Sequence, residues 1–330
     1  MQPIDPILLE VDNLQVEFRT GSGTVRAVNG VSFALSEGET LCIVGESGSG
    51  KSITGETIMG ILDTPPGFVT AGAIRYRGRD LLTLDEDAVN AIRGRSIAMV
   101  FQDALATLNP VLPVGSQIAE MFERHLRMPH ARARDAAIAV MEKVQIPAAR
   151  DRFGNYPHQF SGGMRQRIMI AMAVALEPDV LIADEPTTAL DVTVQAGIIQ
   201  LLGELCAERQ MGMILITHDL SVVANVADSV AVMYAGRIVE QSPVEPIFEA
   251  PRHPYTIGLM RSLPRVETGV DLATIPGSPP DPRHIPKGCA FHPRCPWARE
   301  RCAVEVPLLR PAGTQRLAAC HFWEEIADVQ

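Results

Sequence analysis

The sequence predicts an α/β fold with three parts: a core on buried parallel strands, an inserted helical subdomain, and a proline- and cysteine-rich C-terminal extension. Apolar, β-prone runs at residues 40–44, 180–183 and 213–217 are each followed by a glycine or a polar residue, as is typical of buried parallel strands. Charged and apolar residues alternate at helical spacing over 117–127 and 130–145. The last 88 residues hold 14 of the 25 prolines and four of the six cysteines, so they form a separate region.

Length, charge and hydropathy exclude several classes of protein. The chain has 330 residues, enough for two domains of roughly 100–200 residues each. Its net charge of −10 argues against a surface that neutralises nucleic-acid phosphates or adheres to anionic lipid. No apolar run approaches the roughly 18–20 residues of a membrane span, and the first residues lack the layout of a secretory signal. We therefore expect a cytosolic chain that binds no nucleic acid.

A phosphate-binding motif joins the first predicted strand to a helix expected from Lys51 towards Leu62. Its sequence is Gly45-Glu46-Ser47-Gly48-Ser49-Gly50-Lys51-Ser52, which satisfies G-x-x-x-x-G-K-[ST] in the strand–loop–helix context that the motif requires. Glycines let the backbone N–H groups and the helix N-terminus point at phosphate oxygens. Lys51 supplies charge to the β- and γ-phosphates, and the Ser52 hydroxyl is a ligand for Mg²⁺. The motif predicts a P-loop NTPase core.

Polar side chains follow the other two predicted strands. Asp184 and Glu185 come after the strand 180–183, and His218 follows the strand 213–217. Asp184 is suited to hold the Mg²⁺ shell, and Glu185 to orient and deprotonate the attacking water. His218, at a strand end beside a nucleotide site, has the γ-phosphate within reach.

A second anion-binding feature opens a long apolar-rich segment. Ser161 is a predicted helix N-cap, and Gly162 and Gly163 leave the first N–H groups of that helix accessible at its positive end. One chain thus carries two phosphate-binding helix starts.

The ordered set of the phosphate motif, Gln102, Ser161-Gly162-Gly163, Asp184-Glu185, Ala189-Leu190-Asp191 and His218 resembles the ATPase subunit of ATP-binding cassette (ABC) transporters. Residues 160–167 are similar to the oligopeptide/dipeptide importer branch of that family. The resemblance implies that two cassettes pair head to tail, so that each ATP lies between the phosphate motif of one and the Ser-Gly-Gly helix of the other.

The resemblance also implies individual roles. Gln102 would sense Mg²⁺ and the attacking water, Asp191 would communicate across the dimer, and His218 would contact the γ-phosphate. Phe18 matches the position where the family stacks an aromatic ring on adenine, although burial in an alternating strand explains an aromatic residue there equally well. The predicted catalytic residues are therefore Glu185, His218 and Gln102, with ATP and Mg²⁺ as cofactors.

The resemblance divides the chain into a nucleotide-binding domain at 1–245 and a C-terminal domain at 246–330. The nucleotide-binding domain contains the helical subdomain at about 103–167. By resemblance, the groove beside that subdomain receives short cytoplasmic helices of the membrane subunits.

Four cysteines of the extension lie within 32 residues: Cys289, Cys295, Cys302 and Cys320. Disulfides do not suit a reducing cytosol, and the spacing matches neither the usual zinc pairs nor the familiar ferredoxin patterns. Spacing alone leaves an iron–sulfur cluster, zinc and free structural thiols open. The resemblance implies a [4Fe–4S] cluster, since some members of the importer branch carry one here, with His292 and His321 as alternative ligands. Cys42 and Cys206 are expected to be core residues.

Taken together, the sequence predicts the ATP-hydrolysing subunit of an ABC importer for di- and oligopeptides or related small solutes. The implied partners are a second ATPase subunit, with a heterodimer favoured, two transmembrane permease subunits, and an extracytoplasmic solute-binding protein acting through them. The implied location is the cytoplasmic face of the inner membrane. The alternatives are a non-transport ABC ATPase of the DNA-repair or chromosome type, a cassette-type translation factor, and a redox-sensing iron–sulfur module. The 110 positions from Lys51 to Ser161 leave no room for the long coiled coil of the DNA-repair type, and a translation factor would usually carry two cassettes.

Overall fold

The computed structural model describes residues 7–21, 23–188, 190–262 and 274–327. The chain divides into two compact units, which we describe one at a time. The first is built mainly from Thr83–Leu215, with Ser36–Glu39; the second comprises Leu9–Leu35, Thr40–Leu82 and the residues from Ile216 onward.

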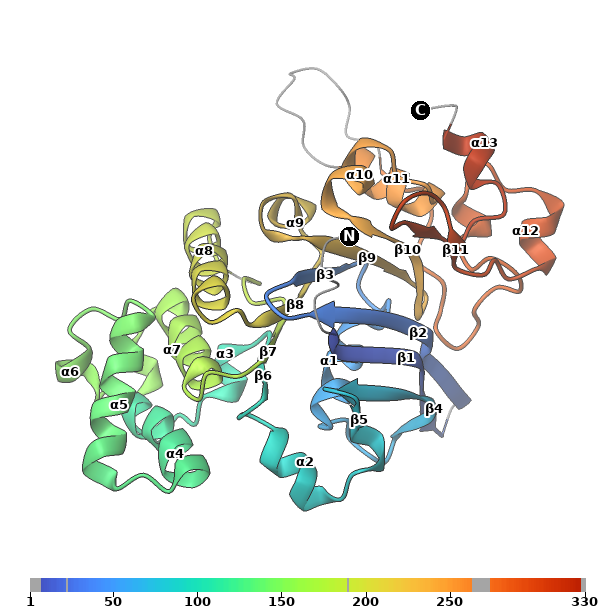
Figure 1. The fold of residues 1–330 in the computed structure, drawn as a ribbon. Coiled ribbons are helices and arrows are strands. Elements are labelled where there is room, and N and C mark those ends of the chain that lie inside the picture. Colours follow the sequence, from blue (N-terminus) through green and yellow to red (C-terminus); the bar gives the residue numbers. More distant parts are fainter. Residues whose placement is uncertain (1–6, 22, 189, 263–273, 328–330) are drawn as a thin grey trace. The chain divides into compact units, whose positions relative to one another are not determined.

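The first unit is mostly helical. Helices α4 to α7 form a cluster that appears in green in Figure 1. The predicted helices at 117–127 and 130–145 are confirmed as α4 and α5, because their apolar residues face the interior of this cluster. The helices of this unit are α2 (Glu86–Ile92), α3 (Ala104–Thr107), α4 (Val114–Leu126), α5 (His130–Lys143), α6 (Ala149–Arg152), α7 (Gly162–Val174) and α8 (Val192–Arg209).

Two parallel strands of the first unit carry polar residues at one end. Strand β6 (Ile97–Val100) pairs with β7 (Val180–Asp184) in a register that matches Ile97 with Val180 and Val100 with Ala183. All nine residues are buried, which explains why the sequence shows unbroken apolar runs. Since the carboxyl ends of parallel strands meet at one edge, the segments after Val100 and Asp184 lie together.

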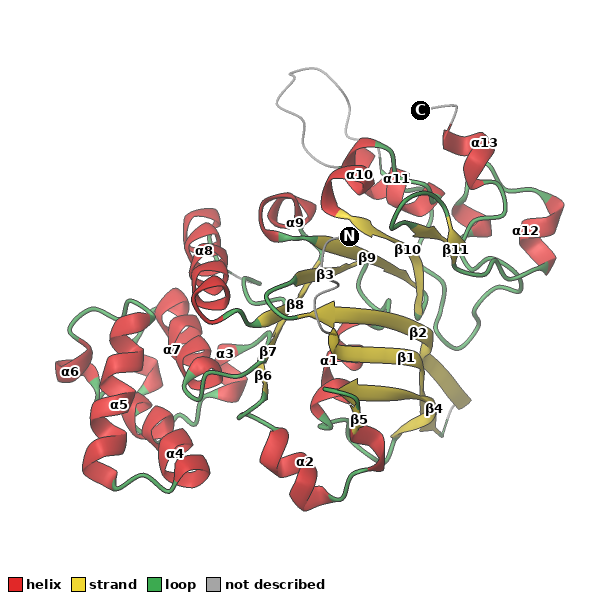
Figure 2. Ribbon diagram, viewed as in Figure 1, coloured by secondary structure: helices red, strands yellow, loops and turns green. Residues whose placement is uncertain are grey.

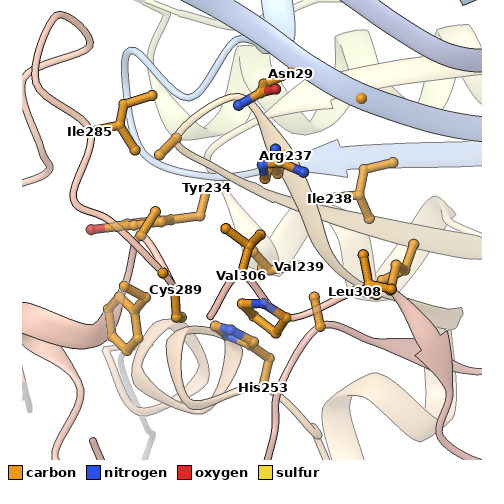
Figure 3. A pocket seen from close by; sticks show the side chains of 18 of the residues that line it. Asn29, Tyr234, Arg237, Ile238, Val239, His253, Ile285, Cys289, Val306 and Leu308 are labelled. Atoms are coloured by element: carbon orange, nitrogen blue, oxygen red, sulfur yellow. The ribbon is translucent and has the colours of Figure 1, made fainter. Parts of the chain in front are cut away.

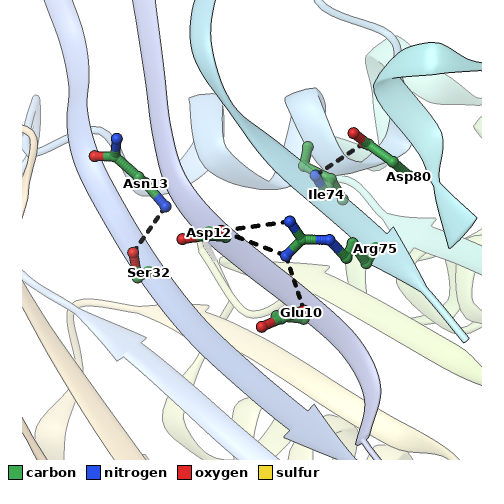
Figure 4. Close-up of polar contacts among 7 residues, drawn as sticks. All are labelled: Glu10, Asp12, Asn13, Ser32, Ile74, Arg75 and Asp80. Atoms are coloured by element: carbon green, nitrogen blue, oxygen red, sulfur yellow. Dashed lines mark hydrogen bonds and ion pairs between the residues drawn. The ribbon is translucent and has the colours of Figure 1, made fainter. Parts of the chain in front are cut away.

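The second unit begins with an antiparallel sheet in the order β2-β1-β4-β5. Its strands are β1 (Ile7–Thr20), β2 (Gly23–Ser36), β4 (Gly67–Tyr76) and β5 (Arg79–Asp80). Arg75 on β4 forms ion pairs with Glu10 at 3.0 Å and Asp12 at 3.4 Å on β1 (Figure 4). The Asn13 N–H donates to Ser32 Oγ at 2.8 Å, so polar side chains also join β1 to β2.

A second set of strands, in the order β11-β12-β10-β9-β3, joins the core to the extension. Strand β3 is parallel to its neighbour β9 (Figure 2). Glu240 and Gln241 on β10 pair with Ala318 and Leu317 on β12. The extension therefore adds strands to the strand group that contains β3. The bounds are β3 (Thr40–Val44), β9 (Ser229–Tyr234), β10 (Arg237–Pro243), β11 (Arg310–Pro311) and β12 (Leu317–Ala318); β8 (Gly212–Thr217) runs from the first unit into the second.

The helices of the second unit are short. Among the helices of the described ranges, none has both the length and the apolar composition that a membrane span requires. They are α1 (Lys51–Met59), α9 (Leu220–Val226), α10 (Val244–Glu249), α11 (Pro254–Arg261), α12 (Glu300–Val304) and α13 (Trp323–Ala327).

Candidate nucleotide site and cysteine lobe

The phosphate motif has the predicted strand–loop–helix geometry: β3 ends at Val44 and α1 begins at Lys51. Two of its glycines are required by close contacts. A Cβ on Gly45 would lie 2.2 Å from the carbonyl oxygen of Met233, and a Cβ on Gly50, at φ +101°, would lie 2.4 Å from that of Ala27. No side chain fits at either position, so the loop packs with its bare backbone against the sheet.

Two buried side chains of this loop bear on ligand binding. Lys51 is 5% exposed, and its ammonium donates to the carbonyl oxygens of Gly45 at 2.8 Å and Glu46 at 3.1 Å. The Ser49 Oγ is buried without a hydrogen-bond partner in the described structure, although buried polar atoms are normally paired. An ammonium and an unsatisfied hydroxyl at the N-terminus of a helix fit a polyphosphate ligand. Ser52 follows on the first turn of α1, and Ser47 and Gly48 are exposed.

The other nucleotide residues of the second unit lie at strand ends. Phe18 is half-buried near the end of β1, where it pairs with Gly67 on β4. His218 directly follows β8 and is exposed. The stacking of Phe18 on adenine and the contact of His218 with phosphate both stay predictions.

The first unit brings Gln102 and Glu185 together. The Gln102 Nε2 donates to Glu185 Oε2 at 3.3 Å, and Asp184, the last residue of β7, is 5% exposed. The Thr188 hydroxyl donates to the same Glu185 oxygen at 2.9 Å. Thr188 was not predicted from the sequence, and its position three residues after Glu185 was the available signal. The Glu185 carboxylate is thus oriented by two donors.

The Ser-Gly-Gly turn and Asp191 meet at one residue of α8. Ser161 caps α7, and its Oγ accepts from the Met164 N–H at 3.4 Å. A Cβ on Gly163 would lie 2.5 Å from Val194 Cγ1, and the Val194 N–H donates to the N-cap carboxylate of Asp191 at 3.0 Å. Gly163 is therefore needed for close packing of the two helix starts, in addition to leaving its N–H accessible.

Cys289, Cys295, Cys302 and Cys320 line one small cavity of about 20 Å³. Aromatic side chains of Phe291, Trp297 and Phe322 complete its wall. Within the described ranges, no group of three or more Cys, His, Asp and Glu residues is close enough to hold a single metal ion. The structure therefore gathers the four thiols without forming a tetrahedral zinc site.

The cavity thiols accept backbone hydrogen bonds. The Phe322 N–H donates to Cys320 Sγ at 3.5 Å, and backbone N–H groups also lower the pKa of Cys289 and Cys295. Burial acts in the opposite direction and is stronger: it raises the pKa of Cys295 to about 11 and that of Cys320 to about 12. Cys295 and Cys320 are thus protonated at neutral pH, but the donors that would stabilise them as thiolate ligands are already in position.

Each of the two histidines beside this cavity donates a hydrogen bond from one ring nitrogen to a backbone carbonyl. His292 Nδ1 donates to the Cys289 carbonyl at 2.9 Å, and His321 Nε2 donates to the Glu305 carbonyl at 2.9 Å. Cys42 and Cys206 are buried in β3 and α8, as expected of core cysteines.

A larger cavity of about 650 Å³ lies where the extension faces β9, β10 and β2 (Figure 3). Tyr234 and Cys289 form part of its wall, and Arg237 reaches it from β10. Burial lowers the pKa of Arg237, and the nearby charge of Arg26 lowers it further. The sequence contains no signal for this cavity, because its wall is assembled from segments far apart in the chain.

The phosphate loop, the oriented carboxylate and the capped Ser-Gly-Gly helix define an ATP-binding cassette. Comparison with known families agrees. Residues 28–188 match the ABC transporter family, and residues 239–302 match the family of the oligopeptide/dipeptide transporter C-terminal region.

Individual proteins resemble the whole chain or the cassette. A putative peptide import ATP-binding protein of Brucella abortus (strain 2308) is 48% identical over 97% of this chain and 98% of its own length. The oligopeptide transport ATP-binding protein OppD of Salmonella typhimurium is 49% identical over 95% of this chain and 93% of its own length. A dimeric structure of the ATP-binding cassette MJ0796 in a post-hydrolysis state with ADP and Pi has a TM-score of 0.64. It is 28% identical and covers 72% of this chain and 99% of its own.

The chain belongs to the ATPase subunits of ABC transporters, in the oligopeptide/dipeptide branch. The predicted P-loop fold, family and ATPase class are thereby confirmed. The competing classes, a DNA-repair ATPase and a free redox module, receive no support from these relatives.

Proposed function

We propose that this chain hydrolyses ATP to power the import of di- and oligopeptides or related small solutes across the cytoplasmic membrane. The observation that carries the proposal is the presence, in one chain, of a phosphate-loop cassette and an oligopeptide/dipeptide-type extension. Residues 1–245 form the nucleotide-binding domain, with its helical subdomain at about 103–167, and 246–330 form the C-terminal domain.

In the proposed reaction, the phosphate loop binds the triphosphate through its backbone N–H groups and Lys51. Ser52, Asp184 and Gln102 would hold Mg²⁺, and the bound ion would neutralise charge on the β- and γ-phosphates. Glu185 accepts a proton from the attacking water, in the orientation set by its Gln102 and Thr188 hydrogen bonds. The hydrogen bonds from Gln102 and Thr188 hold this carboxylate where it can accept that proton while the water attacks the γ-phosphate in line.

The remaining site residues act in a pair of cassettes. Ser161, Gly162 and Gly163 present the N-terminus of α7 to the ATP bound on a second cassette, since a helix start with free N–H groups attracts phosphate. Asp191 couples that helix start to α8 through Val194. His218 contacts the γ-phosphate, and Phe18 stacks on adenine.

The proposed partners are a second ATPase subunit, two permease subunits and an extracytoplasmic solute-binding protein. A heterodimer of ATPase subunits is favoured. The chain would then lie on the cytoplasmic face of the membrane as a peripheral subunit, held there by the permease.

The function is tested by reconstituting the chain with its permease subunits and a peptide-loaded binding protein in proteoliposomes. We expect ATP turnover to rise with the loaded binding protein, together with uptake of labelled peptide into the lumen. DNA or ribosomes should leave turnover unchanged. ATP turnover that follows DNA instead, with no uptake, would contradict the transport proposal.

We further propose that Cys289, Cys295, Cys302 and Cys320 hold a [4Fe–4S] cluster. The donor set supports this, since all four thiols line one cavity and three of them, those of Cys289, Cys295 and Cys320, accept backbone N–H groups. A cubane binds its four thiolates on separate irons, so it needs sulfurs farther apart than the ligands of one zinc ion do.

The cluster is tested by visible absorption, iron, sulfide and zinc analysis of anaerobically purified protein. We expect about four irons per chain in the wild type and in the control variant Cys206→Ser, which alters a buried cassette cysteine. Cys302→Ser should lose the colour and the iron. A colourless wild type without iron would refute the cluster, and zinc at one per chain would replace it with a zinc site.

A further inference from the structure

An arginine of the cysteine lobe reaches the phosphate loop. Arg294 lies between Cys289 and Cys295 in sequence and forms a two-pronged ion pair with Glu46, the second residue of the loop, 248 positions away. Nη1 lies 2.7 Å from Glu46 Oε2, and Nη2 lies 3.0 Å from Oε1. The Arg294 side chain is 6% exposed and that of Glu46 is 28% exposed, so water screens the pair only weakly.

The same guanidinium is fixed on its other edges. Its Nε donates to the Pro276 carbonyl at 2.9 Å, and Nη1 also donates to the Tyr234 hydroxyl at 3.3 Å. The ion pair with Glu46 raises the pKa of Arg294. A guanidinium held by Glu46, Pro276 and Tyr234 has little rotamer freedom left. The position of the Arg294 backbone therefore determines where the Glu46 carboxylate is held.

Tyr255 makes a second contact to the same residue of the loop. The Glu46 N–H donates to the Tyr255 hydroxyl at 2.8 Å. The Tyr255 side chain is fully buried, and its ring packs 4.6 Å from that of Tyr234 and 5.4 Å from that of Phe291, centroid to centroid. Three packed aromatic rings therefore fix the hydroxyl that receives the loop N–H.

The Glu46 carbonyl is engaged as well, by the Lys51 ammonium. Lys51 is the side chain that binds the β- and γ-phosphates in this motif, so a bound nucleotide competes for the ammonium. If the ammonium turns to phosphate, the loop loses its internal Lys51 contacts at Gly45 and Glu46. The contacts from Arg294 and Tyr255 do not depend on Lys51 and can hold Glu46 throughout.

We propose that Arg294 and Tyr255 are positioning residues of the phosphate loop, through which the folded cysteine lobe sets the affinity of the cassette for nucleotide phosphates. This inference rests on the proposed role of the loop. Neither residue touches the nucleotide; both act through Glu46. Because the loop N–H groups cradle the α- and β-phosphates, ATP and ADP should be affected alike.

The test titrates Mg–ATP and Mg–ADP into the full chain and its variants by equilibrium binding. Arg294→Met should weaken both nucleotides about tenfold, since it removes a buried charged hydrogen-bond pair. Tyr255→Phe, which keeps the ring and removes the hydroxyl, should weaken both about threefold. Arg294→Lys, which keeps the charge but not the fork, should fall between Arg294→Met and the wild type.

The matched control is Arg283→Met. Arg283 also forms a two-pronged pair in the extension, with Asp281 at 2.7 to 3.1 Å, but within the described residues no hydrogen bond or ion pair joins that pair to the loop. Its variant should bind both nucleotides as the wild type does. Thermal unfolding of each variant separates loss of fold from loss of positioning, and Tyr255→Phe serves if Arg294→Met does not fold.

A double-mutant cycle with Glu46→Gln decides whether the effect passes through Glu46. We expect the double variant Glu46→Gln Arg294→Met to bind ATP about as weakly as whichever single variant binds it more weakly. If the two changes acted independently, their fold losses of ATP affinity would multiply. Wild-type affinity in Arg294→Met and Tyr255→Phe, or full additivity in the cycle, would overturn the inference. A wild type that binds no ATP would instead refute the proposed function.

Discussion

The extension should lose stability in mild acid because of one buried histidine. His253 is the N-cap of α11, and its Nδ1 accepts the Tyr255 N–H at 3.1 Å. The backbone N–H of His253 donates to Glu240 Oε2 at 2.8 Å. The side chain is 1% exposed, and burial lowers its pKa from 6.5 to about 3. A proton on Nδ1 would remove the cap acceptor and place a charge in an apolar site.

The sign follows from the direction of the shift. Above pH 6.5 the imidazole is neutral in both the folded and the unfolded chain, so it does not change the free energy of unfolding. As the pH falls from 6.5 towards 3, the unfolded chain binds a proton that the folded chain does not, so stability is lost. At pH 5, which is 1.5 pH units below the pKa of 6.5 in the unfolded chain, the free energy of unfolding is lower by about 2 kcal/mol. The buried Glu240 carboxyl, whose pKa burial raises, shifts stability in the opposite direction, and the thiols of Cys295 and Cys320 stay neutral throughout this range.

The assay is urea unfolding at pH 7 and pH 5, followed by tryptophan fluorescence. Both tryptophans, Trp297 and Trp323, belong to the extension, so the signal reports this region. His253→Asn keeps a capping acceptor without a titrating group, and it should lose about 2 kcal/mol less than the wild type between the two pH values. His284→Asn changes a histidine whose side chain is 81% exposed and should behave as the wild type. Equal losses in wild type and His253→Asn would refute the reasoning.

The remaining predictions concern the nucleotide site. Glu185→Gln should bind ATP yet hydrolyse it about 10²- to 10⁴-fold more slowly, since it loses the proton acceptor; normal turnover would exclude Glu185 as the base. Lys51→Ala should lose ATP binding in an equilibrium titration, and binding at wild-type affinity would contradict the motif assignment. Gly50→Ala should destabilise the chain by about 2 kcal/mol more than Gly48→Ala in thermal unfolding, because both have positive φ but only Gly50 has a backbone oxygen 2.4 Å from the new Cβ. Equal effects would mean that the loop relaxes.

Sequence patterns predicted the elements whose environment is uniform along their length. Strand β3 has the expected bounds, and β7 and β8 each extend one residue beyond them, because a strand buried on both faces is apolar at every position. Ser161 was predicted as a cap because capping depends on residues only three apart. Helix α1 ends at Met59, earlier than expected, since Gly60 adopts the left-handed conformation that stops a helix.

Contacts between distant segments could not be predicted. Neither Arg294 nor Glu46 stands in a local sequence pattern that predicts an ion pair between them. Such patterns relate residues a few positions apart, whereas these two are 248 positions apart. The same holds for the cavity behind Tyr234 and for β11 and β12, which have two residues each and no periodicity. Such features depend on tertiary folding, which brings together residues that no local rule relates.

The extension is thermodynamically tied to the nucleotide loop. Its own elements are short, and much of its anchorage lies on the core: strand pairing of β12 with β10, the buried carboxylate of Glu240, and the ion pair of Arg294 with Glu46. Coupling between two sites is reciprocal, so a folded lobe that tightens nucleotide binding is itself stabilised by bound nucleotide to the same degree. A ligand of the four thiols would shift the same folding equilibrium towards the folded lobe, because it binds only that form. On this proposal the cysteine lobe influences ATP binding without any contact with ATP, through Arg294, which lies between Cys289 and Cys295 in sequence.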